Sequence, residues 1–337
     1  MIKHFSAIQE PDWTARVVDR RDMTYREGPS DEEDRPPHVR AASGLSAFLE
    51  YLAVIQDDAN WLALVDSEQR VTAVPLPPGP RGDRVFSKSR GNQDDKYDLE
   101  ACVTVATGEV RELIGFSSGS RGEREWILRV QEGSEGSKFD AEFLPAPDFY
   151  RYMRELEAFS GAGLNIEGAL SLDNDRIRLF QRGNAVPCRG LNPVDATADI
   201  SWQDLCRHLA NPEHEPAPEL SNICRYDLGR LGDVRLTFSD AEHLADGRVL
   251  YSASAENSES GEIQGSILGI IEKSGEARWA HLFDEDGEAF AHKIEGLTID
   301  PTDRTKVYFV IDDDDEETPS CICHAVVSAD MLKSPCD

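Results

Sequence analysis

The 337-residue sequence has far fewer basic than acidic residues: 35 lysines and arginines against 64 aspartates and glutamates. Its formal net charge is −29 at pH 7. Such a surface repels phosphate backbones and anionic lipids, because their binding depends on lysine and arginine. We therefore expect no nucleic-acid partner and no membrane partner. The negative charge is also consistent with a role in solubility alone. It would in addition attract divalent cations to the surface.

Long apolar runs are also missing. No stretch approaches the ~18 apolar residues that cross a bilayer, and residues 1–10 lack the features of a secretory signal. The seven cysteines are scattered and form no CxxC pair, which argues against a disulfide framework or a zinc ribbon. A GxSxG elbow is absent too, which disfavours the serine mechanism of α/β-hydrolases. These absences favour a cytoplasmic protein with reduced thiols.

What the sequence does contain is a short repeat. Five tetrads follow an apolar, acidic, small, apolar pattern, at residues 42–45, 99–102, 166–169, 241–244 and 294–297. The second place is Glu in four tetrads and Ser43 in the first. Their spacings of 57, 67, 75 and 53 residues are close to the length of a four-stranded propeller blade with long loops, and a fixed period indicates a repeat architecture.

Each tetrad opens a series of short apolar segments broken by Gly, Asp, Asn or Pro, as in antiparallel strands. Few segments alternate strictly, which is expected for strands buried on both faces between stacked blades. We predict an all-β fold, a five-bladed β-propeller in which residues 1–337 form a single domain. A strand at 15–19 would complete the last blade and close the ring. A sixth, degenerate blade between residues 167 and 242 is the alternative.

Four segments depart from the strand pattern. Residues 148–160 and 201–210 have apolar residues at helical spacing, and Ser201 is a candidate N-cap. They predict helical insertions outside the blade cores. Segments 28–38 and 77–95 are rich in proline, glycine and charge, and we expect mobile surface loops there.

Strand direction predicts where a site would lie. In an antiparallel blade the second strand returns to the face from which the first strand starts, so tetrads and second-strand exits share one face. The expected exits are polar in every repeat, at residues 56–58, 117–121, 181–184, 254–257 and 312–315. The sequence therefore predicts an axial funnel in which Glu100, Glu167, Glu242 and Glu295 gather beside Ser43.

Clustered carboxylates need a cation or basic residues, or else their pKa values rise. Oxygen ligands in a loosely shaped cage suit Ca²⁺, and the candidate metal ligands are Glu100, Glu167, Glu242, Glu295, Asp57, Asp312 and Asp313. The same four glutamates and His292 are the candidate catalytic groups for acid–base work on a sugar or ester. Candidates for binding a small polar or anionic substrate are Ser43, Ser118, Ser120, Arg121, Arg182, Asn184, Lys96 and Lys293. A purely structural role, in which the glutamates cap backbone N–H groups, stays open.

Two segments carry a family resemblance. Residues 293–300, with the sequence KIEGLTID, precede a strand-like run that ends in acidic residues 312–314, and residues 165–169 and 178–184 repeat this arrangement. The pattern resembles the signature of phytase-like (esterase-like) β-propeller proteins, in an uncharacterised bacterial branch. The resemblance implies a calcium-binding propeller that hydrolyses phosphate or carboxylic esters. The sequence lacks a phytase catalytic signature, so phytate itself is not the expected substrate.

The leading hypothesis is therefore a calcium-dependent hydrolase of a small phosphate or carboxylic ester. One alternative is a non-catalytic propeller that binds a ligand or a protein on the same face. A second alternative is a glycan-processing enzyme that uses two axial carboxylates without a metal. The sequence leaves the oligomeric state open.

Overall fold

A computed structural model describes residues 2–133, 138–173, 175–257, 260–300, 302–313 and 315–333. Its strands are β1 (Lys3–Ser6), β2 (Ile8–Gln9), β3 (Ala15–Asp22), β4 (Ala42–Phe48), β5 (Tyr51–Gln56), β6 (Trp61–Val65), β7 (Val71–Pro75), β8 (Leu99–Thr107), β9 (Val110–Ser117), β10 (Trp126–Glu132), β11 (Phe139–Pro145), β12 (Ile166–Leu172), β13 (Arg176–Gln181), β14 (Asp195–Ser201), β15 (Ser221–Asp227), β16 (Arg230–Leu231), β17 (Val234–Arg235), β18 (Thr237–His243), β19 (Val249–Glu256), β20 (Ile263–Ile271), β21 (Ala277–Phe283), β22 (Ile294–Ile299), β23 (Lys306–Ile311) and β24 (Cys321–Val327). Its helices are α1 (Pro147–Glu155), α2 (Glu157–Ser160), α3 (Trp202–Ala210) and α4 (Ala329–Leu332), with a 3₁₀ turn η1 (Gln93–Asp95).

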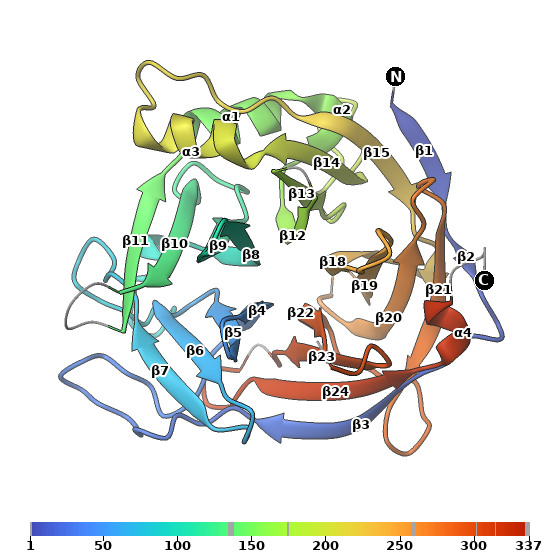
Figure 1. Cartoon of the computed structure of the whole chain (residues 1–337), viewed down its shortest axis with the longest axis horizontal. Helices are drawn as coiled ribbons and strands as arrows, with labels where there is room; N and C mark the ends of the chain where they lie inside the picture. The colour runs from blue at the N-terminus through green and yellow to red at the C-terminus, as the bar shows by residue number, and fades with distance from the viewer. Residues whose placement is uncertain are drawn as a thin grey trace.

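The strands form five antiparallel units of four around one axis (Figure 1). Blade 1 contains β4–β7, blade 2 β8–β11, blade 3 β12–β15, blade 4 β18–β21, and blade 5 β22–β24 with β3. The five innermost strands contact one another in a closed ring, in the order β4, β8, β12, β18, β22 and back to β4. The predicted all-β propeller with five blades is confirmed. Within the described residues, the interval offered for a sixth blade holds the rest of blade 3, α3 and the small hairpin β16–β17.

The N-terminal segment covers the outer edges of three consecutive blades. Strand β1 pairs in parallel with β15, β2 pairs in parallel with β21, and β3 pairs antiparallel with β24. The strand predicted at 15–19 is therefore the outer strand of the last blade, and Val17 on it is 2% exposed. Covering a sheet edge in this way removes a row of unpaired backbone groups.

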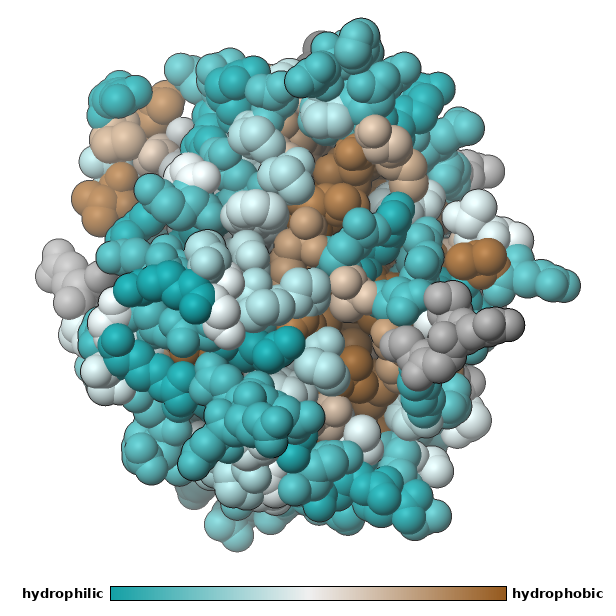
Figure 2. Space-filling view, turned by 90° about the vertical axis from the view of Figure 1, so that its left-hand side faces the viewer, coloured by the Kyte–Doolittle hydropathy of each residue, from teal (hydrophilic) through white to brown (hydrophobic). Residues whose placement is uncertain are grey.

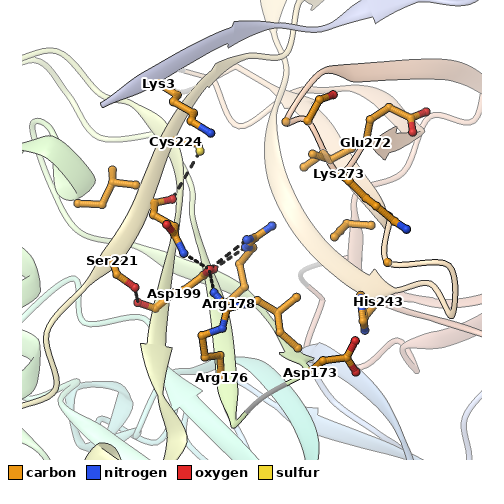
Figure 3. Close-up of a pocket in the computed structure, with 18 of the residues that line it drawn as sticks. Lys3, Asp173, Arg176, Arg178, Asp199, Ser221, Cys224, His243, Glu272 and Lys273 are labelled. Carbon is orange, nitrogen blue, oxygen red and sulfur yellow. Dashed lines mark hydrogen bonds and ion pairs between the residues drawn. The ribbon is translucent and has the colours of Figure 1, made fainter. Parts of the chain in front are cut away.

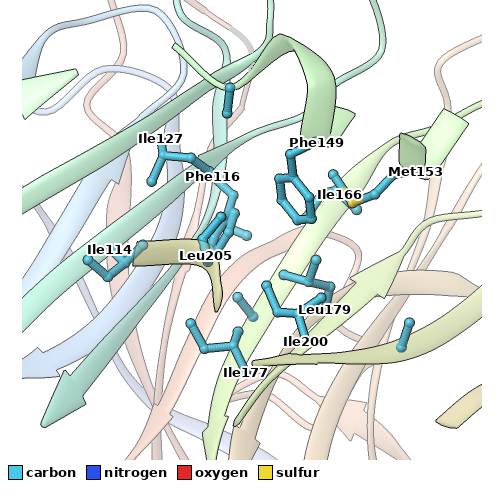
Figure 4. Close-up of a cluster of buried hydrophobic side chains, with 14 of the residues drawn as sticks. Ile114, Phe116, Ile127, Phe149, Met153, Ile166, Ile177, Leu179, Ile200 and Leu205 are labelled. Carbon is cyan, nitrogen blue, oxygen red and sulfur yellow. The ribbon is translucent and has the colours of Figure 1, made fainter. Parts of the chain in front are cut away.

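The hydrophobic core consists of layers between neighbouring blades. In the layer between blades 2 and 3, Ile114 and Phe116 face Ile177 and Leu179, with side chains from the helices beside them (Figure 4). Both faces of these strands are buried, which explains why the sequence segments are apolar throughout rather than alternating.

Helices lie at both predicted places. The first prediction is realised as α1 and α2, which are separated at Leu156, and the second as α3. Ser201 is the predicted N-cap, since its hydroxyl accepts a hydrogen bond of 3.1 Å from the Asp204 amide. The expectation that these helices lie outside the blade cores is wrong. Phe149 of α1 and Leu205 of α3 are fully buried in the layer between blades 2 and 3, because an amphipathic helix must bury its apolar face.

The loops 28–38 and 77–95 contact each other. One carboxylate oxygen of Asp34 accepts hydrogen bonds from the amides of Arg84 and Val85, at 2.8 and 2.9 Å, and the other lies 2.7 Å from Arg90. Their mobility stays a prediction.

Hydrophilic side chains cover most of the side of the molecule seen in Figure 2, in keeping with the charged composition. Within the described ranges, no helix is long and apolar enough to cross a membrane.

Candidate functional site

Each innermost strand begins with the same irregularity. The pairing of the first two strands of a blade skips one residue between Ala42 and Gly44, Leu99 and Ala101, Ile166 and Gly168, Phe238 and Asp240, and Ile294 and Gly296. Such a β-bulge bends the strand and redirects a side chain, often beside a functional site. The skipped residues are Ser43, Glu100, Glu167, Ser239 and Glu295, so the second place of the tetrad is the bulge.

In blade 4 the predicted tetrad lies three residues after the actual bulge. The bulged residue is Ser239 rather than Glu242, and its hydroxyl lies 2.9 Å from that of Ser254. The segment 241–244 imitates the apolar–Glu pattern, but strand β18 has already begun at Thr237. Residues 238–241 were the correct match, with Ser at the second place as in blade 1.

Glu242 consequently lies away from the predicted funnel. Its carboxylate accepts a hydrogen bond of 2.9 Å from Thr298 and lines a smaller cavity of about 190 Å³ with Ser46 and Thr104. These residues lie further along the inner strands, so this cavity is at the other end of the axis. The prediction of Glu242 as a ligand or catalytic group of the funnel is corrected by its position.

A cavity of about 460 Å³ lies where the inner strands begin. The side chains that line it include Ser43, Asp57, Asp98, Glu100, Ser120, Arg124, Asn165, Glu167, Arg182, Asn184, Glu256, Lys293, Glu295 and Asp312. We call it the axial cavity. Bulge residues, second-strand exits and the residues just before the tetrads all contribute to it, as strand direction predicts.

One side of the axial cavity contains three carboxylates from blades 1 and 2. Asp57, Asp98 and Glu100 each offer an oxygen within 4.8 Å of the other two. The Lys96 ammonium lies 2.7 Å from Asp57 Oδ1 and 2.9 Å from Asp98 Oδ1, and Arg124 lies 2.8 Å from Asp98 Oδ2. Glu100 has no hydrogen bond or ion pair among the residues that the structure describes, which leaves its carboxylate available to a ligand.

The other side of the axial cavity contains two basic residues and three glutamates. Arg182 lies 3.0 Å from Glu167 Oε1 and 2.5 Å from Glu256 Oε2. Lys293 lies 2.8 Å from Glu295 Oε2 and 3.8 Å from Glu167 Oε2. Asn165 Nδ2 donates to Glu167 Oε1 over 2.7 Å, so Glu167 is held by three side chains.

The carboxyl groups outnumber the basic groups around this cavity. Seven carboxyl side chains line it, while Arg124, Arg182 and Lys293 line it and Lys96 lies behind it. Burial and repulsion from Asp57 and Glu167 raise the pKa of Glu100 well above its usual range. Burial, with repulsion from Glu167, raises the pKa of Glu295 to about 8 against the opposing effect of Lys293. The cavity is therefore suited to take up a cation or protons.

Two neighbouring carboxyl groups differ in the direction of their shifts. Burial and the charge of Asp98 raise the pKa of Asp57 well above its usual range, although Lys96 opposes this. Burial acts in the same direction on Asp98, but Lys96 and Arg124 outweigh it and lower the pKa of that carboxyl. The two carboxyl groups thus share Lys96 but differ in surroundings, because only Asp98 also faces Arg124.

Several predicted residues lie outside the cavity lining. His292 and Asp313 contact each other over 3.0 Å, and Arg20 of the outer strand β3 lies 2.9 Å from the His292 ring. His292 is corrected as a catalytic candidate, because its ring is engaged at blade 5 and does not line the axial cavity. Asp313 is corrected as a ligand for the same reason. Asp314, part of the same acidic run, is outside the described residues.

Two of the predicted substrate-binding residues are also displaced. The Ser118 hydroxyl bonds to Asp98, and Arg121 is 64% exposed with Asp94 3.9 Å away. Neither side chain lines the axial cavity. Ser120, Asn184, Arg182, Lys293, Asp57 and Asp312 do line it, whereas Lys96 supports it from behind through Asp57 and Asp98.

Sequence reasoning missed Asp98, Asn165, Arg124 and Glu256. Asp98 and Asn165 immediately precede their tetrads, as Lys293 does in blade 5, and this shared place was the available signal. Glu256 lies at a second-strand exit but was not selected. Arg124 had no signal, because a loop brings it to Asp98.

The carboxylates of blades 1 and 2 fit a calcium ion by chemistry and size. Ca²⁺ binds oxygen at about 2.4 Å, so its ligand atoms lie within about 4.8 Å of one another. Asp57, Asp98 and Glu100 satisfy that limit. Lys96 is a competing cation between two of them, so an ion at this place would have to displace the ammonium.

The fold and this cavity define a β-propeller with an acidic axial site. The chain belongs to the family of unknown function DUF6929, whose model matches residues 38–327. The match covers all five inner strands. It does not name the phytase-like group, so that resemblance stays a prediction. No curated protein sequence matches the chain.

Solved structures that are similar to this chain are distant. Glutaminyl cyclase from Myxococcus xanthus has 10% identity and a TM-score of 0.42, over 97% of this chain and all of that one. Virginiamycin B lyase from Staphylococcus aureus has 10% identity and a TM-score of 0.41, over 94% and 99% of the two chains. A thermostable family-43 glycoside hydrolase has 12% identity and a TM-score of 0.43, over 86% and 90%. Similarities of this size carry no argument about activity, and the fold assignment rests on the strand pairing.

Proposed function

We propose that this chain is a cytoplasmic, calcium-dependent hydrolase of a small phosphate or carboxylic ester, with the axial cavity as its active site. The observation that carries the proposal is the group Asp57, Asp98 and Glu100, whose ligand oxygens lie within 4.8 Å of one another. Glu100 has no hydrogen bond or ion pair in the described part of the chain, and burial together with the neighbouring carboxylates raises its pKa against the opposing effect of Lys293. The phytase-like resemblance of residues 293–300 supports the same assignment.

Each group in the cavity then has a chemical role. Asp57, Asp98 and Glu100 would hold the ion, which when bound polarises an ester oxygen and orders water. Arg182 and Lys293 present hydrogen-bond donors that suit an anionic or polar substrate group. Glu295 holds its proton up to a pKa of about 8, so it is suited to exchange a proton with the reacting group near neutral pH.

The test uses purified protein treated with EDTA and then titrated with CaCl₂ by calorimetry. Hydrolysis of p-nitrophenyl phosphate and p-nitrophenyl acetate is measured in parallel, with and without Ca²⁺. We expect Glu100→Gln to weaken calcium binding and calcium-dependent hydrolysis. Glu109→Gln, at an exposed turn between β8 and β9, is the matched control and should change neither. Absence of both calcium binding and ester hydrolysis in the wild-type protein would overturn the proposal.

A second candidate function is metal-free processing of a glycan by two axial carboxyl groups. It is favoured by carboxyl groups of the cavity whose pKa values move apart: burial raises the pKa of Glu295 to about 8, as suits a general acid, whereas Lys96 and Arg124 lower the pKa of Asp98, as suits an ionised group. Hydrolysis of p-nitrophenyl glycosides in EDTA that is lost in both Glu100→Gln and Glu295→Gln would support this candidate over the first. Calcium binding without hydrolysis of any of these substrates would instead support a ligand-binding propeller.

A further inference from the structure

A larger cavity lies at the opposite end of the propeller, between blades 3 and 4. Its volume is about 950 Å³, and Figure 3 shows residues from both blades facing it. Asp173 follows β12, Arg176 begins β13, and His243 ends β18. Asp173 and His243 thus mark the far ends of the inner strands β12 and β18, which begin at the axial cavity. The two cavities are thus separate, and we call this one the interblade cleft.

A buried carboxylate organises one wall of the interblade cleft. Asp199 on β14 is fully buried, and its Oδ1 accepts from Arg178 Nε at 2.6 Å. Its Oδ2 accepts from Arg176 at 3.0 Å, from Arg178 Nη2 at 3.1 Å and from Asn222 Nδ2 at 2.9 Å (Figure 3). Asp199 therefore fixes two guanidinium groups side by side.

Both guanidinium groups keep donors free for a ligand. Arg178 Nη1 and Arg176 Nη2 have no hydrogen-bond partner in the part of the chain that the structure describes. The side chains of Arg176 and Arg178 remain 39% and 23% exposed toward the cleft. A guanidinium that is already held in place loses little freedom when it binds an anion, and its planar fork matches phosphate oxygens.

Two lysines add charge from other elements. Lys3 enters the cleft because β1 pairs with β15, and Lys273 enters from the turn between β20 and β21. Both side chains are exposed, and neither forms an ion pair among the described residues.

The acidic groups of the cleft are largely neutralised from outside it. Asp246 pairs with Arg248 at 2.8 Å, and Glu272 pairs with Arg278 at 2.8 Å. The remaining acids, Asp173 and Asp199, face four basic residues: Lys3, Arg176, Arg178 and Lys273. Arg278 also pairs with Glu10, at 3.4 Å. When these outer partners are counted, basic groups still exceed acidic groups by one at the cleft, in a protein whose net charge is −29.

We infer that the interblade cleft binds a phosphorylated small molecule through its phosphomonoester dianion. Two guanidinium groups held in place by Asp199, together with two lysines, offer several charged donors to the oxygens of that group. The volume is within the range of about 300–1,000 Å³ that is typical of small-molecule sites, which leaves room for a sugar or nucleoside beside the phosphate. The inference does not depend on the function proposed for the axial cavity.

The test is calorimetric titration at low ionic strength, with EDTA present so that the axial cavity holds no metal. The probes are AMP, inorganic phosphate and adenosine. We expect AMP and phosphate to bind and adenosine not to bind, because the dianion carries the recognition. Affinity for AMP should fall as salt is added, since the basic side chains are partly exposed.

The variant that locates the site is Lys3→Gln combined with Lys273→Gln, because neither lysine supports a buried group. It should lose about tenfold or more in affinity for AMP. Lys88→Gln, an exposed lysine outside the cleft, is the matched control and should bind as the wild type does. Three results would each overturn the inference: no binding of AMP and phosphate to the wild type, equal binding to the double variant, or equal binding of adenosine.

Discussion

Arg182 on one side of the axial cavity lies 3.0 Å from Glu167, and each side chain is only 4% exposed. Arg182 also pairs with Glu256 and donates to Thr237 across blades 3 and 4. A buried charge that loses its partner is strongly destabilising, whereas an intact pair can be close to neutral. Removing Arg182 therefore tests how much the basic residues of the cavity stabilise its buried carboxylates.

Arg182→Met should destabilise the protein by about 3–5 kcal/mol, because it leaves Glu167 and Glu256 without their main cation. Urea denaturation monitored by tryptophan fluorescence measures the change. Arg121→Met is the control, since Arg121 is exposed and its only ion pair among the described residues is with Asp94 at 3.9 Å. Equal stability of the two variants would contradict this account of Arg182.

Lys96→Met should increase the affinity of the axial cavity for Ca²⁺ by about tenfold. The substitution removes the ammonium that competes for Asp57 and Asp98, and a divalent ion then relieves the repulsion between them. Calcium titration by calorimetry gives the affinity, and the melting temperature with and without Ca²⁺ gives an independent value. A destabilised Lys96→Met protein that Ca²⁺ does not restore would show that these carboxylates do not form an ion site.

The stability of the metal-free protein should fall as pH rises from about 5 to about 8. The folded protein holds a proton on Glu295 up to a pKa of about 8, whereas an unfolded glutamate loses it near pH 4.3. Across this window the folded state therefore binds more protons than the unfolded state. The free energy of unfolding is highest at the low-pH end and decreases as Glu295 loses its proton. Glu295→Gln should make the stability less dependent on pH. Urea denaturation midpoints at several pH values between about 5 and about 8 measure this. Glu109→Gln should leave it unchanged, and a slope of the opposite sign would contradict the raised pKa.

Gly296→Ala should separate the inner strands of blades 5 and 1. A Cβ atom at this residue would lie 2.4 Å from the Leu45 amide nitrogen and 2.6 Å from the Gly44 carbonyl carbon, and neither backbone atom can move independently. We expect a loss of about 1–3 kcal/mol, as for other overpacked cores, together with weaker ligand binding at the adjacent Glu295. Gly122→Ala is the control, because no atom lies within 4 Å of its Cβ position. A fully stable Gly296→Ala protein would contradict this close packing.

Val17→Asp should destabilise the protein far more than Val18→Asp, although the residues are neighbours on β3. Val17 is buried at 2% exposure, whereas Val18 is 47% exposed. A buried unpaired carboxylate costs several kcal/mol, so thermal denaturation should separate the two variants clearly. Similar melting temperatures would indicate that β3 does not close blade 5 as described.

The sequence predicted most of the fold because a propeller blade has a local signature. Four tetrads mark the first residues of their inner strands, and the polar exits that follow them reach the same cavity. The strand at 15–19 was recognisable because it precedes the first tetrad and had no other partner. The helical spacing of 148–160 and 201–210 was equally visible.

The start of the inner strand of blade 4, and the contacts between side chains at the site, could not be predicted in the same way. Ala241 and Glu242 imitate a tetrad, and only the pairing of β18 with β19 shows that Ser239 is the bulge. His292 is next to a tetrad in sequence, yet its ring contacts Arg20 of a strand from the other end of the chain. Arg124 reaches Asp98 through a loop whose path has no sequence pattern.

The sequence by itself determined that the chain folds as a β-propeller with an acidic axial face, because strand length, period and apolar content are local properties. The closed ring of inner strands then decided between five blades and six. Only the tertiary structure decided which carboxyl groups meet. Hydrogen-bond register between strands sets which residue is bulged toward the axis, and loops far apart in the chain bring Lys96, Arg124 and Arg182 to particular partners. Burial then sets the pKa of Glu295 and Glu100, and burial depends on every blade at once.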